Sequence, residues 1–418
     1  MVGRKSNVRP KRSHGYAPRV LTLALALPLV VGAVVAVVAL AGGRDGGLPV
    51  ARGASGGAFH PVAGLFVPDA TAIEDCGDDQ PCLRQAYGNL SFREGPRAAL
   101  ALFERRMAED RVVLQGCHQI AHVIGAAAFE RYGGDVARTF SEGSPACVSG
   151  YYHGILDRAF LGIETEQRLA DVARSLCAGS GLRRFGFLDY QCRHGLGHGL
   201  MIQTGYDLPL ALAICGELGT GWDRVACSSG VFMENVDTRF GVRSPWLDDE
   251  DPLYPCGRVD AQDRRSCYLR ASWRLLAANG HDFASAARAC LTLGRWAETC
   301  ARGLGRDVAE SARYAPGRIL VLCAVTGSTQ ADCLFGAART VANASGEAGI
   351  VPATRLCRRA PVPQRRSCFA GVGVVVGMLQ PTDAARAAAC ARVSRLHRQV
   401  CLDTARAEVD PRGVHSWG

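Results

Sequence analysis

Lysine is almost absent from this chain of 418 residues, and arginine supplies nearly all of its basic charge. The only two lysines are Lys5 and Lys11, close to the amino terminus. P-loop nucleotide hydrolysis, protein-kinase chemistry and Schiff-base catalysis each require a lysine in the folded domain, so the sequence excludes these three classes. A CxxCH motif is also missing, which excludes covalently attached c-type haem.

Aromatic residues are scarce as well, at 7% of the chain, and neither an aromatic-basic RNA motif nor a zinc-finger spacing occurs. The formal net charge is +9 at pH 7, but part of it comes from a basic segment at the amino terminus. We therefore expect no nucleic-acid partner. With 48% hydrophobic residues, a chain of this length can bury a large core.

The amino terminus has the pattern of a signal anchor. Residues 1–19 are basic, and residues 20–41 form a run of 22 residues without a charge, which is long enough to cross a lipid bilayer. We predict a cytoplasmic tail, a single transmembrane helix in the cell membrane, and the rest of the chain outside. A cleaved signal peptide is the alternative, because cleavage after Ala41 is acceptable and would give a secreted protein.

The remaining chain divides by composition into three parts. Residues 42–70 are rich in glycine and are predicted to be a flexible linker. Residues 71–410 are predicted to form an extracytoplasmic domain of helical repeats, whose first half, about 115–240, is rich in histidine. Residues 411–418 are expected to be a frayed tail.

Cysteine is abundant. The 18 cysteines fall into nine pairs of neighbours along the chain. An oxidising compartment favours disulfides, so we predict one disulfide within each pair. The predicted pairs are Cys76 with Cys82, Cys117 with Cys147, Cys177 with Cys192, Cys215 with Cys227, Cys256 with Cys267, Cys290 with Cys300, Cys323 with Cys333, Cys357 with Cys368, and Cys390 with Cys401.

The cysteines also mark a repeat. From Cys177 onward, the first members of successive pairs are 38, 41, 34, 33, 34 and 33 residues apart. A period near 34 residues predicts helical hairpins that stack because none can bury its apolar face alone. The predicted fold is therefore all-α: an α/α solenoid of hairpins behind the transmembrane helix, with a disulfide joining the two helices of each hairpin.

A glycine recurs at one position of the repeat. Six of the eight second cysteines, counted from Cys147, are followed three residues later by glycine. Glycine in a helix costs up to about 1 kcal/mol relative to alanine. We therefore expect two backbones to approach closely at this position.

In repeat length and in having one disulfide per hairpin, residues 177–408 resemble the cysteine-rich Sel1-like and tetratricopeptide-like solenoids. The resemblance implies stacked helical hairpins. The chain lacks the glycine and alanine consensus of either group, so the resemblance carries over no functional residues.

Histidine is concentrated in the first half of the predicted domain. Two pairs have the spacing i, i+4, which places both members on one helix face. His153 and His198 each lie six residues after a second cysteine, and stacking places equivalent positions on neighbouring helices in a row. The candidate metal ligands are His118, His122, His153, His194 and His198.

Imidazole is the commonest protein ligand of borderline metals. Five histidines exceed a closed tetrahedral site, so we expect either one open ion with water or two neighbouring ions, with Zn, Fe, Mn and Cu not distinguished. Glu234 is a candidate carboxylate ligand or general base. The alternative is close helix packing around glycine, with the histidines hydrogen-bonded in a polar seam.

The later repeats carry other side chains six residues after the second cysteine, so we expect metal chemistry only in the first half. These residues are Trp273, Arg306, Arg339 and Val374.

Two functions follow from these patterns. The first is a membrane-anchored extracytoplasmic protein with a histidine-rich metal- or ligand-binding site, whose enzymatic activity the sequence leaves undecided. The second is a non-enzymatic solenoid that binds a peptide, a glycan or another envelope protein. Five histidines within residues 118–198 favour the first, because a scaffold has no need of them.

Overall fold

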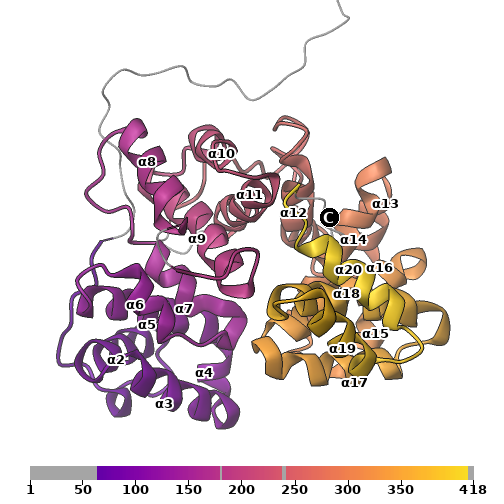
Figure 1. The fold of residues 1–418 in the computed structure, drawn as a ribbon, viewed down its shortest axis with the longest axis horizontal. Helices are drawn as coiled ribbons and strands as arrows, with labels where there is room; N and C mark the ends of the chain where they lie inside the picture. Colours follow the sequence, from indigo (N-terminus) through magenta and orange to yellow (C-terminus); the bar gives the residue numbers. More distant parts are fainter. Residues whose placement is uncertain (1–63, 179–180, 238–241, 413–418) are drawn as a thin grey trace, which may run out of the picture. The chain divides into compact units, whose positions relative to one another are not determined.

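The computed structural model describes residues 64–178, 181–237 and 242–412, in which the regular structure is helical and no β-strand occurs (Figure 1). All of them belong to one compact unit of the chain, residues 47–418. The predicted tail at 1–19, the transmembrane helix at 20–41 and most of the linker at 42–70 lie outside the described residues. Within the described ranges, no helix has both the length and the apolar character needed to span a bilayer.

Most helices of the described residues follow one another with short connections; the connection between α11 and α12 is the long exception. The α-helices are α2 (Gln80–Glu94), α3 (Pro96–Glu109), α4 (Arg111–Gln115), α5 (Cys117–Arg131), α6 (Val136–Ser141), α7 (Ala146–Leu156), α8 (Glu166–Leu176), α9 (Phe187–Gln203), α10 (Leu208–Gly216), α11 (Gly221–Val236), α12 (Arg264–Ala278), α13 (Phe283–Leu291), α14 (Ala297–Ser311), α15 (Pro316–Ala324), α16 (Gln330–Asn343), α17 (Ile350–Arg359), α18 (Arg365–Leu379), α19 (Asp383–Val393) and α20 (Arg398–Glu408). Short 3-10 helices are η1 (Ile73–Asp75), η3 (Gly294–Trp296), η4 (Gly327–Thr329), η5 (Gly346–Gly349) and η6 (Val362–Gln364).

Side-chain caps explain where many of these helices begin. An Asp or Thr residue directly before the helix accepts a hydrogen bond from a backbone N–H of the first turn, a group that has no partner inside the helix. The capping residues are Asp79, Asp110, Asp135, Thr165, Asp207, Thr220, Asp282 and Thr382.

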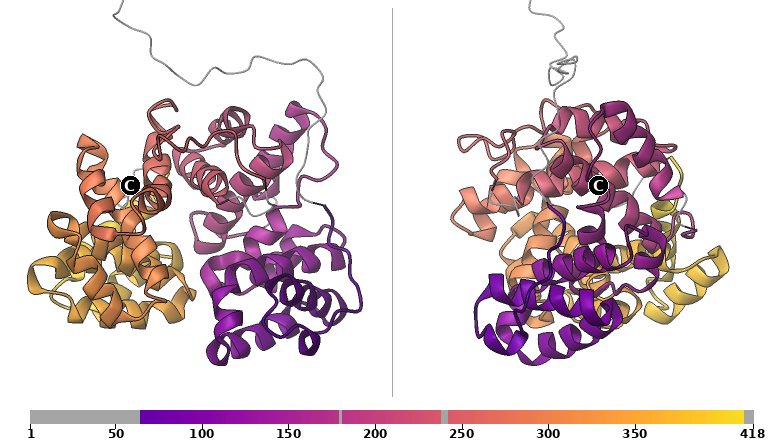
Figure 2. Two further views of the ribbon diagram at one scale, coloured as in Figure 1. Left: turned by 180° about the vertical axis from the view of Figure 1, so that it is seen from behind. Right: turned by 90° about the vertical axis from the view of Figure 1, so that its left-hand side faces the viewer.

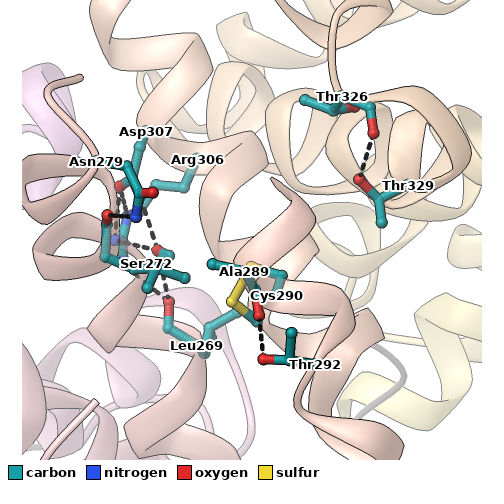
Figure 3. Close-up of a disulfide and its surroundings, with 12 residues drawn as sticks. Leu269, Ser272, Asn279, Ala289, Cys290, Thr292, Arg306, Asp307, Thr326 and Thr329 are labelled. Atoms are coloured by element: carbon teal, nitrogen blue, oxygen red, sulfur yellow. Dashed lines mark hydrogen bonds and ion pairs between the residues drawn. A yellow bond between two sulfur atoms is a disulfide. The ribbon is translucent and has the colours of Figure 1, made fainter. Parts of the chain in front are cut away.

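The cysteines are joined in nine disulfides, and the pairs are the predicted ones, with Cα–Cα distances from 5.3 to 5.9 Å. In most hairpins from Cys177 onward, the disulfide links the end of one helix to the first turns of the next, and Figure 3 shows the one at Cys290. The chain is therefore a row of disulfide-linked helical repeats.

One hairpin departs from the predicted pattern. Cys256, the partner of Cys267 in α12, lies in a non-helical segment, so no helix precedes α12 in its hairpin. Pro245, Pro252 and Pro255 interrupt this segment, and proline lacks the N–H group that a helix interior needs. The irregular segment coincides with the longest step in the cysteine spacing.

The second helices of the hairpins pack against one another in chain order, as Figures 1 and 2 show. Neighbours in this row are α5 and α7, α7 and α9, α9 and α11, α11 and α12, α12 and α14, α14 and α16, α16 and α18, and α18 and α20. We call these helices the central row. They carry much of the buried surface, and the first helices of the hairpins lie beside them.

Glycine makes the close packing of the central row possible. A Cβ atom on Gly230 would lie 1.9 Å from the carbonyl oxygen of His194, and one on Gly336 would lie 1.9 Å from that of Arg302. Gly303 meets a carbonyl oxygen of the preceding central-row helix in the same way, at 2.2 Å. The close backbone approach predicted from the repeated glycine is therefore confirmed.

The domain packs slightly beyond its predicted start. Residues 64–70 contain no helix, as expected for the linker, but Phe66 is buried in a small cluster that also contains Phe92 and Val123. Packed structure therefore reaches into the segment that the composition assigns to the linker.

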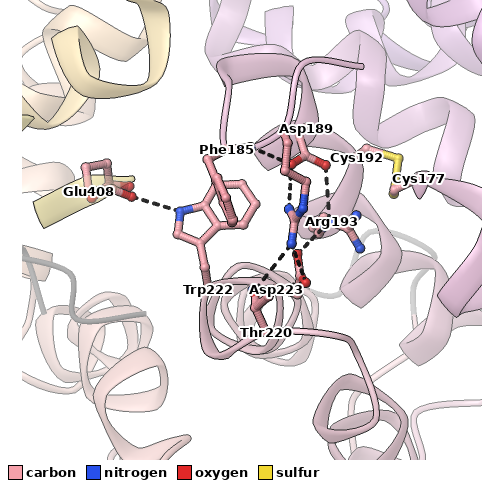
Figure 4. Close-up of polar contacts among 10 residues, drawn as sticks. Cys177, Phe185, Asp189, Cys192, Arg193, Thr220, Trp222, Asp223 and Glu408 are labelled. Atoms are coloured by element: carbon pink, nitrogen blue, oxygen red, sulfur yellow. Dashed lines mark hydrogen bonds and ion pairs between the residues drawn. A yellow bond between two sulfur atoms is a disulfide. The ribbon is translucent and has the colours of Figure 1, made fainter. Parts of the chain in front are cut away.

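The carboxyl-terminal helices return to the middle of the chain. The backbone N–H of Trp222 in α11 donates to the carbonyl oxygen of Pro411 at 3.1 Å, and its indole Nε1 donates to that of Glu408 at 2.8 Å (Figure 4). Arg183, just before α9, donates to the carbonyl oxygen of Met378 in α18. The end of the repeat row is thus attached to α9 and α11.

Candidate metal centre

The structure brings the five predicted histidines together. They come from three adjacent helices of the central row: His118 and His122 from α5, His153 from α7, and His194 and His198 from α9. The His153 ring lies in the middle, with its centroid 5.5 Å from that of His118 and 4.8 Å from that of His198. We call these five residues the histidine cluster.

Most of the cluster is shielded from solvent. His122, His153, His194 and His198 are at most 4% exposed, whereas His118 is half-buried. Burial, followed by the nearby positive charge of Arg270, lowers the pKa of His194 well below its ordinary value. His194 is therefore neutral at pH 7, which is the form that binds metals.

Two buried carboxylates orient two of the rings. The Nδ1 atom of His122 lies 2.9 Å from Oδ2 of Asp157, and the Nδ1 atom of His198 lies 2.7 Å from Oε2 of Glu234. The hydroxyl of Tyr206 donates to the other Glu234 oxygen at 2.9 Å. A carboxylate accepts the Nδ1 proton, so each Nε2 atom carries its lone pair toward the cluster, the orientation seen in carboxylate–histidine–metal triads.

A backbone carbonyl orients a third ring. The Nδ1 atom of His118 lies 2.9 Å from the carbonyl oxygen of Cys147, which begins a left-handed turn. The φ angles of Cys147, Val148 and Ser149 are 51°, 57° and 63°, and regular α7 geometry starts at Gly150. Left-handed backbone costs roughly 1–2 kcal/mol per non-glycine residue, and such strain is concentrated at functional sites.

The Nε2 atoms within each helix pair lie close together. Those of His118 and His122 are 3.1 Å apart, and those of His194 and His198 are 3.3 Å apart. In the first pair both Nδ1 atoms face oxygen acceptors, so in two neutral rings both Nε2 atoms carry lone pairs, which repel each other at this distance. A tetrahedral ion with M–N bonds of about 2.0–2.1 Å separates its nitrogens by roughly 3.3 Å and removes this repulsion.

Three groups of side chains have ligand atoms that all lie within 4.8 Å of one another. Two of the groups share His153, which can complete either helix pair. The third adds both buried carboxylates. The groups are His118, His122 and His153; His153, His194 and His198; and Asp157, His198 and Glu234. These residues could hold one divalent transition-metal ion or two adjacent ions.

Comparisons with protein-family models, curated proteins and solved structures found no match. The chemical geometry of the cluster therefore carries the functional argument.

An ion-pair network holds α9 against α11. Arg193, adjacent to His194, lies 3.1 Å from Asp189 and 2.7 Å from Asp223, and Arg184 lies 2.7 Å and 2.6 Å from the same two carboxylates (Figure 4). Both aspartates are almost fully buried. The network restrains the rotation of α9 about its own axis, and with it the direction of the α9 histidines.

A cavity of about 430 Å³ reaches the cluster at His118, its most exposed member. The cavity is lined by segments of α4, α5, α7, α11 and α14. The lining residues are Leu114, Gln115, Cys117, His118, Gln119, Cys147, Val148, Met233, Asp237, Glu310, Arg313 and Tyr314. A small molecule in this cavity would meet the cluster through the His118 ring.

Sequence reasoning missed two residues of the site. Asp157 lies four residues after His153, the same spacing as in the two histidine pairs, and this spacing could have identified it. Tyr206 lies in the loop between α9 and α10, where no local pattern marks it. Glu234 was predicted as a ligand or base; the structure places it against His198 and Tyr206, where it orients the ring, and the role of general base stays a prediction.

Proposed function

We propose that this chain is an extracytoplasmic metalloprotein whose histidine cluster binds divalent transition-metal ions. The observation that carries the proposal is the 3.1 Å separation of the His118 and His122 Nε2 atoms, with both Nδ1 atoms held by oxygen acceptors. With both rings neutral, the two acceptors at Nδ1 leave no proton for an N–H···N bond between the Nε2 atoms, so a metal-free polar seam requires one ring to be protonated, such as His122 beside Asp157.

The proposed site has one metal position at each i, i+4 pair of histidines, with His153 between the two positions. Asp157 and Glu234 act from outside the ligand shell and raise the basicity of His122 and His198. Imidazole-rich shells suit Zn, Cu and Fe better than Mn.

The half-buried His118 ring gives the proposed site its reactive face. A metal ion seated there supplies Lewis-acid or redox chemistry to a molecule in the cavity. The buried side of the cluster, around His194 and His198, keeps bulk water away from the other ligands. The chain thus combines a shielded ligand set with one accessible edge.

We also propose that the protein is anchored in the cell membrane by residues 20–41, with the helical domain outside. The uncharged run, its basic flank and the nine disulfides support this location. Membrane fractionation should recover the full-length chain only with detergent. A soluble mature chain starting at Gly42 would instead identify a cleaved signal peptide.

The test of the metal site is elemental analysis of the full-length protein after exposure to Zn, Mn, Fe and Cu. We expect about two equivalents of bound metal. A His118→Ala/His122→Ala variant and a His194→Ala/His198→Ala variant should each lose half of it or more. A His281→Ala/His397→Ala variant is the matched control, since both histidines lie outside the cluster, and it should retain all of the metal.

The proposal fails if the wild-type chain binds no more metal than a variant lacking all four of the paired histidines. Circular dichroism must show that this variant is folded. In that case the cluster is a polar seam, and the alternative function as a scaffold for a peptide, glycan or envelope protein is preferred.

A further inference from the structure

A second group of charged side chains lies farther along the central row. One small cavity is lined by Arg270 in α12, Arg306 in α14 and Arg339 in α16. We call these three residues the arginine cluster. No carboxylate is among the residues that line this cavity, which are Leu269, Arg270, Arg302, Arg306, Phe335, Gly336 and Arg339. Arg306 and Arg339 occupy the repeat position that holds His198 in α9.

Arg270 stands out because its charge is buried without a carboxylate partner. It is 6% exposed, and its Nε and Nη2 atoms donate to the neutral hydroxyl of Ser229 at 3.2 and 2.8 Å. Among the described residues it forms no ion pair, whereas Arg306 lies 2.6 Å from Asp307 (Figure 3). Buried charges are normally paired, so this guanidinium is suited to an anionic partner.

The nearest carboxylates do not compensate this charge. Asp237 and Glu310 line an adjoining cavity of about 220 Å³ together with Arg270 and Arg306. Although both residues are exposed overall, desolvation of their carboxyl groups by neighbouring side chains raises the pKa of Glu310 to about 7 and also raises that of Asp237. These exposed carboxylates form no ion pair with Arg270 among the described residues, so its guanidinium is left without a buried counter-charge.

A buried hydroxyl near the arginine cluster also lacks a partner. Tyr190 in α9 is 3% exposed, and its hydroxyl makes no hydrogen bond to any described residue. Its ring stacks on that of His194, with centroids 5.6 Å apart, and it lies close enough to Arg270 to influence its charge. Buried hydroxyls are almost always hydrogen-bonded, so Tyr190 supplies a second donor without an acceptor.

We propose that Arg270, with Arg306, Arg339 and Tyr190, binds the oxyanion of a small ligand, a carboxylate or a phosphate group. An oxyanion accepts several hydrogen bonds at once and would satisfy both the guanidinium and the phenol. The inference deepens the proposed function by naming the class of molecule that the metal centre meets, and it rests on that function for the ligand's role.

The cavities give the ligand a path to the histidine cluster. The 220 Å³ cavity beside Arg270 and the 430 Å³ cavity at His118 share Met233, Asp237 and Glu310 in their linings. A ligand with its anionic group at Arg270 can therefore extend toward His118. Arg270 fixes one end of the molecule and leaves the other end for the metal centre.

The test uses the full-length protein, with inorganic phosphate and acetate as separate probes, measured by calorimetry and thermal shift. Wild type should bind one of the two, and which one distinguishes a phosphate from a carboxylate ligand. Arg270→Gln should weaken binding at least tenfold. Tyr190→Phe should weaken it several-fold, and Arg295→Gln, the same charge change at an exposed position, should leave it unchanged.

Binding should also persist in metal-free protein and in the His194→Ala/His198→Ala variant. Loss of metal with retained anion binding would refute only the proposed metal centre. The inference is overturned if neither probe binds wild type, or if Arg270→Gln binds as tightly as wild type. Should Arg270→Gln fail to fold, Tyr190→Phe decides: anion binding equal to that of wild type overturns the inference.

Discussion

The two halves of the central row have the same backbone packing and different chemistry. In α7 and α11, as in α14 and α16, the repeated glycine meets a carbonyl oxygen of the preceding helix. The position six residues after the second cysteine holds histidine in α7 and α9 but arginine in α14 and α16. The comparison teaches that glycine and disulfides are common to both halves of the helix frame, while the side chain at one repeat position changes between them.

The halves also differ in how buried polar groups find partners. Around the histidine cluster, Asp157 and Glu234 come from neighbouring helices and satisfy the rings. Around the arginine cluster, Arg306 pairs with the next residue in the chain, Asp307, and Arg270 has only a hydroxyl. We propose a cation for the first region and an anion for the second, and the cavities beside them share Met233, Asp237 and Glu310 in their linings.

The largest expected effect comes from the shared glycine packing. Gly230→Ala and Gly336→Ala each place a Cβ atom 1.9 Å from a carbonyl oxygen, so the helices must separate. We expect each to lower the free energy of unfolding by about 2 kcal/mol in denaturant titrations. Only Gly230→Ala should also reduce bound metal, because the carbonyl oxygen that the new Cβ atom would meet belongs to His194.

Gly257→Ala is the control for this pair, since its Cβ would meet no atom within 4 Å. Stabilities of the two helix variants equal to that of the control would show that the central row does not depend on these close approaches.

The next largest effect on metal binding distinguishes the carboxylates that orient cluster histidines from a carboxylate of the arginine half. Asp157→Asn and Glu234→Gln remove the charge that holds the Nδ1 proton of a cluster histidine, and each should weaken metal binding by about 10–100-fold. Asp307→Asn, a buried carboxylate of the arginine half, should leave metal affinity unchanged. Competition with a chelator at constant pH measures all three, and equal affinities throughout would refute an orienting role for the carboxylates.

A pH effect is expected in the arginine half. Desolvation of its carboxyl group by neighbouring side chains raises the pKa of Glu310 to about 7 from its ordinary 4.5, although the residue is exposed overall. Between these values the folded chain binds more protons than the unfolded chain, so this residue makes stability fall as pH rises through the window. Glu310→Gln should flatten that part of the stability–pH curve in denaturant titrations. An unchanged slope would show that Glu310 titrates normally.

The smallest effect concerns the hydrogen bond from Tyr206 to Glu234. Tyr206→Phe removes it and should weaken metal binding several-fold, consistent with about 1 kcal/mol for one hydrogen bond. Tyr132→Phe is the matched control, because the Tyr132 hydroxyl makes the same kind of bond to Glu142 at 2.8 Å outside the site. Equal losses of metal affinity in both variants would point to a general effect of tyrosine removal.

The features that could be predicted from the sequence depend on spacing along the chain. Repeat length, disulfide pairs and glycine positions follow from separations of a few to about 40 residues. Histidines spaced i, i+4 lie on one face of a helix, so a helix assignment is enough to bring the members of each pair together. These patterns were enough to identify the helical repeats and the five histidines that the fold gathers.

The remaining features depend on tertiary contacts or local backbone. Tyr206 lies in a loop and donates a hydrogen bond to Glu234. The left-handed turn that begins at Cys147 contains no glycine in its left-handed positions, so the sequence does not predict it. The unpaired state of Arg270 appears only when its neighbours are known, because arginine on a helix usually extends into solvent. The prolines before Cys256, by contrast, indicate from the sequence alone that this segment does not form a helix.

The bonds from Trp222 to Glu408 and Pro411 have a consequence for how the protein comes apart. A linear array with two loose ends melts unit by unit, starting from whichever terminus is weaker. Here the last helix is tied to a tryptophan 186 positions earlier, so fraying at the carboxyl terminus must also disturb the middle of the array. Melting should therefore be concerted, and removal of residues 408–418 should make it stepwise.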